Sequence, residues 1–312
     1  MDQSLTLLGV TLDADTSRGS VRLLHDISFS LPRDSMTALI GESGSGKTTL
    51  ALTITRLFTH SERYHLWGSI MLGDRPIGQL GERELRDVRQ NSIRYVFQEP
   101  PLAFNPLMRI GHQIADAAGG ALHGRETATL LQRVGLDQPE RILDAYPHEL
   151  SVGMLQRISI AMAIAHPPAV LIADEPTSSL DAAHRRQVMD LLSGLQHRFG
   201  IAVLVITHDP IVIEQYADAV VVLYAGRIIE RAGREEFFRQ PLHPFSRSLL
   251  DASRKVRARS AVREAIPIRF DALPTGCTFH PRCPVMLEAC KLSEPILEMT
   301  DSRRWIRCIN WK

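Results

Sequence analysis

A glycine-rich stretch, GESGSGKT from Gly41 to Thr48, has the residue types and spacing of a phosphate-binding loop. Its glycines let the backbone turn so that successive N–H groups point at phosphate oxygens, at the start of a helix whose dipole favours negative charge. Lys47 is then placed to reach the β and γ phosphates, and the Thr48 hydroxyl to ligate Mg²⁺. An accidental glycine-rich turn is the alternative, disfavoured by the strand expected before the loop and the helix expected after it. The predicted nucleotide-binding residues here are Gly41, Ser43, Gly44, Ser45, Gly46, Lys47, Thr48 and Thr49.

Two acidic residues, Asp174 and Glu175, directly follow the apolar run AVLIA. A carboxylate at the end of a buried strand can hold Mg²⁺ through water, and its neighbour can orient or deprotonate an attacking water. His208 follows a similar run, IAVLVIT. Taken singly, the acidic pair also suits a solvated loop, and the histidine also suits a structural role.

Four cysteines, the whole complement of the chain, lie near its C-terminal end. Disulfides are disfavoured in a reducing cytosol, and inert burial does not explain the clustering. Zinc, held by four thiolates or by three with His280, normally needs pairs of ligands two to four residues apart. An iron–sulfur cluster tolerates looser spacing, and a Cys-Pro step is typical of bacterial cluster ligands. The residues alone leave these alternatives open for Cys277, Cys283, Cys290 and Cys308.

The composition is that of a soluble globular protein: 312 residues, 44% hydrophobic and 23% charged, which suits one large domain plus a small appendage. A formal net charge of +1 gives no global attraction to nucleic acid, so no nucleic-acid partner is expected. The start, MDQSLTLLGV, does not resemble a signal peptide, and the apolar runs fall short of the roughly 18 residues of a membrane span. We therefore expect a cytosolic protein that reaches a membrane only through other chains.

Strands and helices are predicted to alternate, which indicates an α/β fold with a parallel sheet covered by helices on both faces. Asp209 followed by Pro210 predicts a helix start, and residues 110–150 read as helices broken by polar turns. The basic stretch 253–269 lacks periodicity and is a candidate linker. The expected domains are 1–252, with a helical part at about 100–165, and a C-terminal extension, 253–312. Strands are predicted at 20–31, 36–40, 92–97, 169–174, 201–207 and 219–224, and a helix at 182–198.

In this order, the motifs resemble those of the ATP-binding subunits of ABC transporters over roughly residues 1–240. GESGSGKT is similar to the Walker A loop of that family, Gln98 in YVFQEP to its Q-loop glutamine, and LIADEP to Walker B. LSVGMLQR stands where the family signature LSGGQ belongs, SSLD at Ser178–Asp181 is similar to the D-loop, and His208 to the switch histidine. The resemblance implies a P-loop NTPase fold of the ABC type with a helical insert.

The same resemblance implies roles for the matched residues. Gln98 would sense the γ-phosphate and join Thr48 at Mg²⁺, Glu175 would position or activate the water, and His208 would stabilise charge in the transition state. Asp174 would belong to the nucleotide-binding set.

The signature departs from the family at Val152, in place of its first glycine, and at Met154, in place of its glutamine. In the family, this segment contacts the nucleotide of a partner subunit, a role that falls here to Ser151 and Gly153. A β-branched residue resists positive φ and close backbone approach. Either the position tolerates valine, or the ATP site that uses this signature is impaired.

The region that holds adenine in the family also departs, because VTLDADTSRG contains no aromatic residue. Apolar contact from Leu12 or a cation–π contact from Arg18 are the substitutes that the sequence offers.

Further segments, FQEPPLAFNP, YPHELS, LHPFSRSLL and a tail with GC.F..RCP, resemble the oligopeptide, dipeptide and nickel importer branch. That resemblance implies an ATPase subunit for import of peptides or a related solute, with nickel or a metal chelate as the alternative cargo. It also implies a second, dissimilar ATPase subunit, two membrane-spanning permease subunits and an extracytoplasmic solute-binding protein. A peripheral place on the cytoplasmic face of the membrane and a [4Fe–4S] cluster on the four cysteines complete the expectation.

Two rival functions come from other classes. A soluble ABC ATPase acting on nucleic acid or ribosomes usually carries a second nucleotide domain or a coiled-coil insert, and this chain shows neither. A regulatory module without turnover is suggested by Val152 and opposed by Glu175 and His208.

Overall fold

The structure is a computed structural model that describes residues 3–17, 19–58, 63–122, 124–178, 180–257, 268–300 and 304–311. The chain forms two compact units. The first comprises Met1–Ser4, Leu31–Ser35 and Gln79–Val205, and the second comprises Leu5–Ser30, Met36–Gly78 and Ile206–Lys312. Among the described residues, no helix combines the length and the apolar character needed to cross a membrane.

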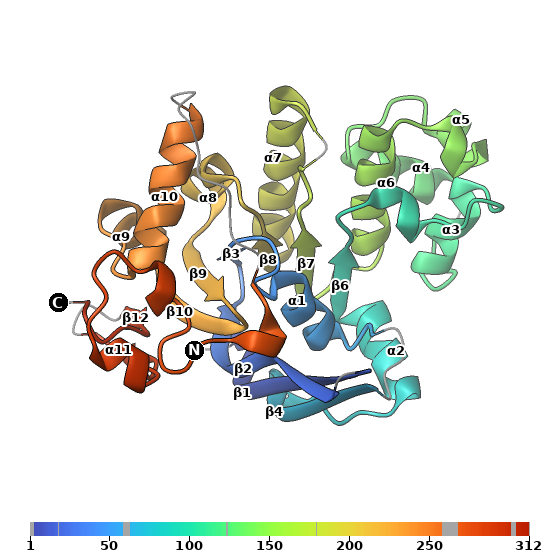
Figure 1. Cartoon of the computed structure of the whole chain (residues 1–312). Coiled ribbons are helices and arrows are strands. Elements are labelled where there is room, and N and C mark those ends of the chain that lie inside the picture. The colour runs from blue at the N-terminus through green and yellow to red at the C-terminus, as the bar shows by residue number, and fades with distance from the viewer. Residues whose placement is uncertain are drawn as a thin grey trace. The chain divides into compact units, whose positions relative to one another are not determined.

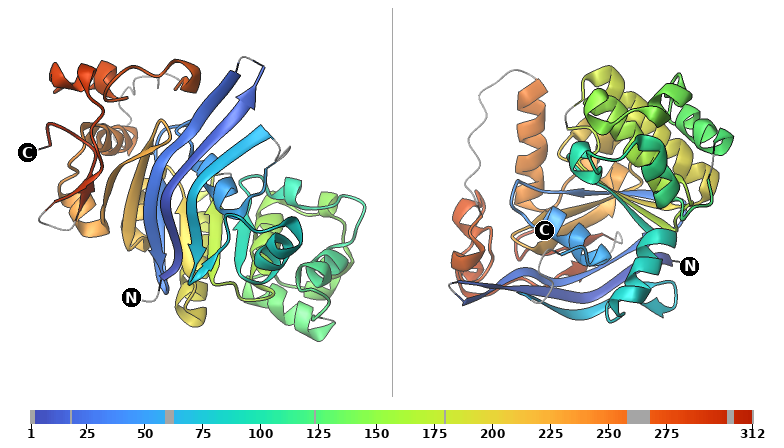
Figure 2. Two further views of the ribbon diagram at one scale, coloured as in Figure 1. Left: turned by 90° about the horizontal axis from the view of Figure 1, so that it is seen from below. Right: turned by 90° about the vertical axis from the view of Figure 1, so that its right-hand side faces the viewer.

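An antiparallel sheet in the second unit has the strand order β2-β1-β4-β5. Its long strands lie side by side in Figure 2. Along β2, buried Ile27, Phe29 and Leu31 alternate with more exposed residues, as expected for a strand with one face in the core. β1 changes register at a bulge between Leu8 and Thr11. The strands are β1 (Gln3–Thr16), β2 (Gly19–Pro32), β4 (Tyr64–Leu72) and β5 (Arg75–Pro76).

A second sheet in this unit has the order β11-β12-β10-β9-β3. β3 and β9 are parallel, with Ala38 opposite Val220, and read as continuous apolar runs because both are buried after their first residue. The predicted strands at 36–40 and 219–224 are therefore confirmed. The elements are β3 (Ser35–Ile40), β9 (Ala219–Tyr224), β10 (Arg227–Gly233), β11 (Glu298–Met299) and β12 (Trp305–Ile306).

Helix α8 of the second unit begins where the local sequence predicts. The carboxylate of Asp209 accepts a hydrogen bond of 2.9 Å from the Ile211 N–H, which confirms the predicted start of α8. α10 continues to Arg257, so the predicted linker starts inside a helix, and 258–267 lie outside the described residues. The helices are α1 (Lys47–Thr55), α8 (Pro210–Tyr216), α9 (Arg234–Arg239), α10 (Pro244–Arg257) and α11 (Ala289–Leu292).

The first unit contains three strands in the order β8-β7-β6, with β6 and β7 parallel. Asp181 accepts hydrogen bonds of 3.0 Å from the N–H groups of Ala183 and His184, which fixes the start of α7. The predicted strands and the predicted helix of this region are confirmed. The elements are α2 (Glu82–Asn91), β6 (Ile93–Val96), β7 (Val170–Asp174), α7 (Ala182–Phe199) and β8 (Ala202–Ile206).

A group of helices between β6 and β7 confirms the helical insert predicted at residues 110–150. These helices, green in Figure 1, contact one another and bury apolar side chains such as Ile114, Leu131 and Ile142. They are α3 (Ile110–Ala117), α4 (Arg125–Arg133), α5 (Pro139–Asp144) and α6 (Val152–Ile164), with 3₁₀ turns at η2 (Pro100–Ala103) and η3 (Pro147–Glu149).

The cysteine-containing tail is built into the second unit, since β12 pairs with β10 and extends its sheet, with Ile306 opposite Glu230. The same Glu230 is fully buried and accepts a hydrogen bond of 2.6 Å from the Arg304 guanidinium. Two-residue strands carry no periodic signal, so this pairing was not predictable from the sequence.

Candidate functional site

The phosphate loop of the second unit connects β3 to α1 as predicted. Gly44 and Gly46 have φ of 74° and 102°, a region open mainly to glycine, and Gly46 is the N-cap of α1. The N–H groups of the first turn of α1 therefore face the loop, as anion binding requires.

Lys47 lies over this loop. Its Nζ donates hydrogen bonds of 2.9 Å to the carbonyl oxygens of Gly41 and Glu42. Three residues of this region are exposed: Ser43, Gly44 and Thr48. Ser45 is fully buried, so it shapes the loop through its backbone and not through an exposed side chain. The Ser45 N–H donates to the Glu42 carbonyl at 3.1 Å, and the carbonyl of Thr49 accepts from the Thr53 hydroxyl inside α1.

The turn between β9 and β10 is hydrogen-bonded to the phosphate loop, a feature that sequence reasoning missed. The Gly226 N–H donates to the Ser45 carbonyl at 2.9 Å, and the Gly226 carbonyl accepts from the His25 N–H at 2.8 Å. Gly226 has φ of 72°, and a Cβ there would lie 2.1 Å from the Leu23 carbonyl oxygen. Only glycine fits this close approach. The dipeptide Ala225-Gly226 is the one local sequence signal that could have indicated this turn.

His208 is exposed and follows β8. The N–H of its neighbour Thr207 donates to the Leu39 carbonyl at 3.3 Å, two residues before the phosphate loop begins. The Thr207 hydroxyl also accepts from the Asp209 N–H at 3.0 Å, which fixes the backbone around the histidine. His208 therefore belongs to the same unit as the loop.

The first unit carries the acidic pair, at the end of β7. Asp174 is 2% exposed and accepts a hydrogen bond of 2.8 Å from the Tyr95 hydroxyl, which comes from the neighbouring strand β6. Burial, and then the negative charge of Asp174, raise the pKa of Tyr95 far above its ordinary value, so the phenol stays a donor. Tyr95 was not among the predicted site residues, because one tyrosine in a strand reads as core.

Glu175 has φ of 46°, a left-handed conformation that non-glycine residues rarely adopt. Such strained residues cluster at functional sites. Gln98 is exposed and lies two residues beyond the end of β6. Since β6 and β7 run parallel, Gln98 and Glu175 leave the sheet at the same edge.

The signature segment forms the start of α6. The Ser151 hydroxyl is the N-cap and accepts from the Met154 N–H at 3.3 Å. Val152 is the first helical residue, has no positive φ, and its side chain is 45% exposed. The expected conflict between valine and a positive φ is therefore wrong, and at position 152 only the bulk of the side chain remains as a departure. A Cβ on Gly153 would make ordinary contact with Leu180 at 3.7 Å.

The substitutes considered for adenine stacking find no support. Leu12 is fully buried, so the expectation that it contacts a base is wrong. Arg18 lies outside the described residues.

The four cysteines come within electrostatic reach of one another. The Cys277 N–H donates to the Cys290 carbonyl at 2.8 Å. Burial, reinforced by the other three thiols, raises the pKa of Cys308 to about 11, and burial also raises the pKa of Cys277 and Cys283. Within the described ranges, however, no three or more His, Cys, Asp or Glu side chains are arranged to hold a metal ion. Neither the zinc alternative nor the iron–sulfur cluster is therefore shown.

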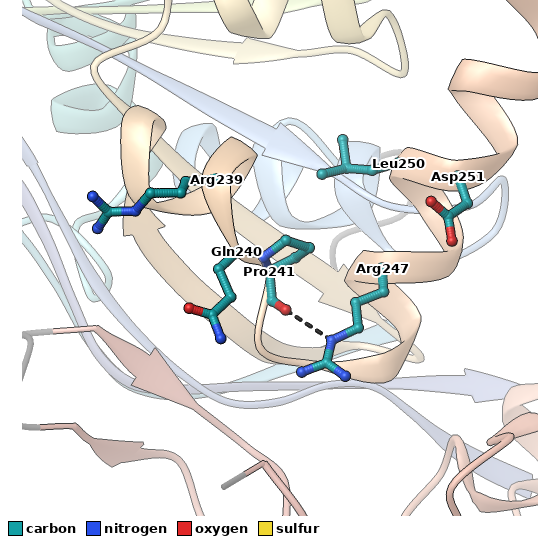
Figure 3. A pocket seen from close by; sticks show the side chains of 6 residues that line it. All are labelled: Arg239, Gln240, Pro241, Arg247, Leu250 and Asp251. Carbon is teal, nitrogen blue, oxygen red and sulfur yellow. Dashed lines mark hydrogen bonds between the residues drawn. The ribbon is translucent and has the colours of Figure 1, made fainter.

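A separate hollow of about 410 Å³ lies between α9 and α10. In it, Arg247 points towards Pro241 and donates to its carbonyl at 2.9 Å (Figure 3). None of its six lining residues is a predicted site residue. They are Arg239, Gln240, Pro241, Arg247, Leu250 and Asp251.

Known proteins resemble this chain along most of its length. A family model described as ABC transporter matches residues 24–178, and one described as oligopeptide/dipeptide transporter, C-terminal region, matches 229–290. The oligopeptide transport ATP-binding protein AppD of Bacillus subtilis is 37% identical over 90% of this chain and 89% of its own length. The oligopeptide transport ATP-binding protein OppD of Escherichia coli is 36% identical over 97% of this chain and 92% of its own length.

Solved structures agree on the fold. A dimeric ATP-binding cassette in a post-hydrolysis state, bound to ADP and Pi, has a TM-score of 0.65 and 25% identity and covers 74% of this chain and 98% of its own. The ABC transporter component cbiO1 of Clostridium perfringens has a TM-score of 0.64 and 28% identity, and the match covers 77% of this chain and 92% of cbiO1. With the phosphate loop, the acidic strand end and these relatives together, the chain belongs to the ABC transporter ATPases, in the branch that carries the oligopeptide/dipeptide transporter C-terminal region.

Proposed function

We propose that this chain binds and hydrolyses ATP to energise import of peptides, or of a related solute, through an ABC transporter. One observation carries the proposal: a phosphate loop with exposed Ser43, Gly44 and Thr48 lies in a chain whose relatives, over nine-tenths of its length, are named oligopeptide transport ATP-binding proteins.

ATP binding falls to the phosphate loop. The backbone from Gly41 to Gly46 and the first N–H groups of α1 receive the phosphates, and Lys47 transfers its hydrogen bonds from the loop carbonyls to phosphate oxygens. Bound Mg²⁺ would neutralise phosphate charge, with Thr48 and Gln98 as ligands and Asp174 holding it through water. The exposed hydroxyl of Thr48 and the exposed amide of Gln98 support this assignment.

Hydrolysis requires an oriented water. Glu175 positions or deprotonates that water, Gln98 senses the γ-phosphate, and His208 stabilises the developing charge. The positive φ of Glu175 supports its role, since such strain persists where function requires a fixed side chain.

A second ATPase subunit, unlike this one, completes each site. Ser151 and Gly153 at the start of α6 reach the nucleotide of that partner, and the exposure of Ser151 and Val152 with the half-buried Gly153 supports such a contact. Two permease subunits and an extracytoplasmic solute-binding protein complete the transporter. They place this chain on the cytoplasmic face of the membrane as a peripheral subunit.

The C-terminal extension, 253–312, is proposed to hold a [4Fe–4S] cluster next to the ATP-binding domain, 1–252. A single zinc ion would draw four sulfurs to within about 4 Å of one another, because each Zn–S bond is about 2.3 Å. A cluster binds each thiolate to a different iron, so its sulfurs stand farther apart. The electrostatic influence of the other three thiols on Cys308 supports one shared site, and the Cys283-Pro284 step supports a cluster at it. Bound, it would stabilise the fold of the tail.

The decisive experiment is Glu175→Gln in the assembled transporter. ATP turnover should fall by at least about 100-fold, because the general base is lost, while ATP binding persists. Glu235→Gln, on the exposed surface of α9, is the matched control. Unchanged ATP turnover in the Glu175 variant contradicts the assigned role. Loss of peptide uptake with intact ATPase activity would mean that the variant affects the coupling of hydrolysis to transport and not hydrolysis itself.

Nickel, the alternative cargo, has no support in the names of the relatives described above, which refer to oligopeptides. Uptake of labelled peptides and of ⁶³Ni²⁺ by cells with and without the transporter decides between the two cargoes. Co-purification with permease subunits, and not with ribosomes or nucleic acid, separates the importer from the soluble rival. Expression of the chain alone tests membrane attachment, because without its partner subunits the chain should remain in the soluble fraction.

A further inference from the structure

An arginine from the tail contacts the phosphate loop. Arg282 ends the 3₁₀ turn η5 (His280–Arg282), and its two terminal nitrogens each donate a hydrogen bond of 2.7 Å to one carboxylate oxygen of Glu42. Glu42 is the second residue of GESGSGKT, and the two residues are 240 positions apart. A bidentate pair of this length is the strongest geometry available to an arginine and a carboxylate.

The pair is largely withdrawn from solvent, with side chains 26% and 18% exposed. The Arg282 guanidinium also lies 5.9 Å from the ring centre of Tyr224 and 5.8 Å from that of Phe279. Its contact with the Tyr224 hydroxyl, at 3.4 Å, is long. These neighbours hold the guanidinium in one place, which an exposed surface pair lacks.

The cysteine-bearing turns carry Arg282. The N–H of Cys283 donates to the His280 carbonyl at 3.2 Å, and the N–H of His280 donates to the Cys277 carbonyl at 3.0 Å. Phe279, 3% exposed, packs against the rings of Tyr224 and Phe245 in the core of the second unit. The position of Arg282 therefore depends on the folded state of the tail.

Glu42 shapes the loop through both of its polar groups. Its carbonyl accepts from Lys47 Nζ and from the Ser45 N–H, while its carboxylate accepts from Arg282. A carboxylate within a loop that binds a polyanion repels the ligand unless a cation compensates it, and at partial burial that repulsion is little screened. Arg282 is the cation in bidentate contact with it.

We propose that Arg282 is a positioning residue for nucleotide binding: it neutralises Glu42 and fixes the phosphate loop, so that full ATP affinity requires the folded tail. This rests on the proposed binding of ATP at this loop. The tail is thereby a part of the nucleotide site, and its unfolding lowers the affinity of the ATPase for nucleotide.

The test is calorimetric titration of the full chain with MgATP and with MgADP. Arg282→Ala should weaken binding about tenfold, which corresponds to about 1.4 kcal/mol, because the charge of Glu42 in the phosphate loop is then uncompensated and repels the phosphates. Arg282→Ala combined with Glu42→Gln should recover most of the loss, because the negative charge that Arg282 neutralises is then absent. Arg282→Lys should recover part of it, since it restores charge without the bidentate contact. The loss in Arg282→Ala should shrink as salt rises.

Arg269→Ala is the matched control, because Arg269 pairs locally with Asp271 on the exposed surface of the same tail. Circular dichroism and limited proteolysis verify that each variant keeps its fold. Wild-type affinity in folded Arg282→Ala overturns the inference. A double variant as weak as Arg282→Ala overturns the electrostatic role, since packing alone would then explain the loss. Failure of the wild-type chain to bind nucleotide, or unchanged binding in Lys47→Ala, contradicts the proposed ATP site itself.

Discussion

Tyr95 donates a hydrogen bond of 2.8 Å to the carboxylate of Asp174, across the parallel strands β6 and β7. The acidic residue that ends β7 is therefore oriented by a phenol from the strand that leads to Gln98. If Asp174 holds Mg²⁺ as proposed, Tyr95 orients that carboxylate without touching the metal, and such residues tune the affinity of a metal site.

Tyr95→Phe should raise the Mg²⁺ concentration needed for half-maximal ATP hydrolysis by about tenfold, because Asp174 loses the donor that orients it. The measurement is a Mg²⁺ titration of ATPase activity in the assembled transporter. Tyr64→Phe, at the start of β4, is the control for removal of a phenol hydroxyl. An unchanged Mg²⁺ dependence would show that Tyr95 serves only the core.

Arg304→Met should lower the free energy of unfolding by about 3–5 kcal/mol, because it leaves the buried carboxylate of Glu230 without its cation. Adding Glu230→Gln should recover part of this loss, because the uncompensated charge is removed and the amide oxygen still accepts from one of the two backbone N–H groups, of Leu242 and of His243, that donate to separate oxygens of Glu230. Urea unfolding of the single and double variants measures the coupling. Strictly additive losses would mean that the two side chains do not stabilise each other.

Acid should destabilise the protein partly through His243. Burial, and next the positive Arg247, lower the pKa of His243 to about 3 from an ordinary value of 6.5. The unfolded chain then binds a proton that the folded chain does not. The free energy of unfolding is at its full value above about pH 6.5 and falls by up to about 1.4 kcal/mol per pH unit towards about pH 3.

His243→Asn tests this pH dependence, because an amide oxygen can still accept from the Phe245 N–H, as Nδ1 does at 3.0 Å, but does not titrate. Its unfolding free energy should change less between pH 6.5 and pH 4.5 than that of the wild type. His25 contributes a slope in both proteins, since burial lowers its pKa to about 4. Equal slopes would assign the acid sensitivity to other groups.

Val152→Gly should raise ATP turnover a few-fold in the complex with the partner ATPase, because it removes the side-chain bulk at the start of α6. Val152→Ala is the matched control: it trims the branch while keeping a good helix former. A rise in both variants identifies bulk as the limit. Unchanged turnover in both would mean that the site tolerates valine.

Protein purified without oxygen should be brown, absorb broadly near 400 nm and contain about four irons per chain, as four cysteine ligands of a [4Fe–4S] cluster require. Cys308→Ser should lower the iron content, while Ser293→Ala in the same tail should not. Colourless anaerobic protein with one zinc per chain would contradict the cluster.

The sequence by itself determined the elements whose signals are local. GESGSGKT predicts a strand, loop and helix because glycine at fixed positions and a lysine at the helix start leave few other conformations. Asp209 with Pro210 predicts the start of α8 in the same way, since both act on the adjoining turn. The buried strands β7, β8 and β9 follow from uninterrupted apolar runs.

Only the tertiary structure decided which distant residues meet. Arg282 reaches Glu42, Tyr95 reaches Asp174, and β12 pairs with β10 across separations that no spacing rule encodes. Val152 reads as an obstacle in the motif, yet its backbone is an ordinary helix start. The physical reason is that local propensity acts over a few residues, whereas burial and charge pairing depend on which surfaces the folded chain brings together.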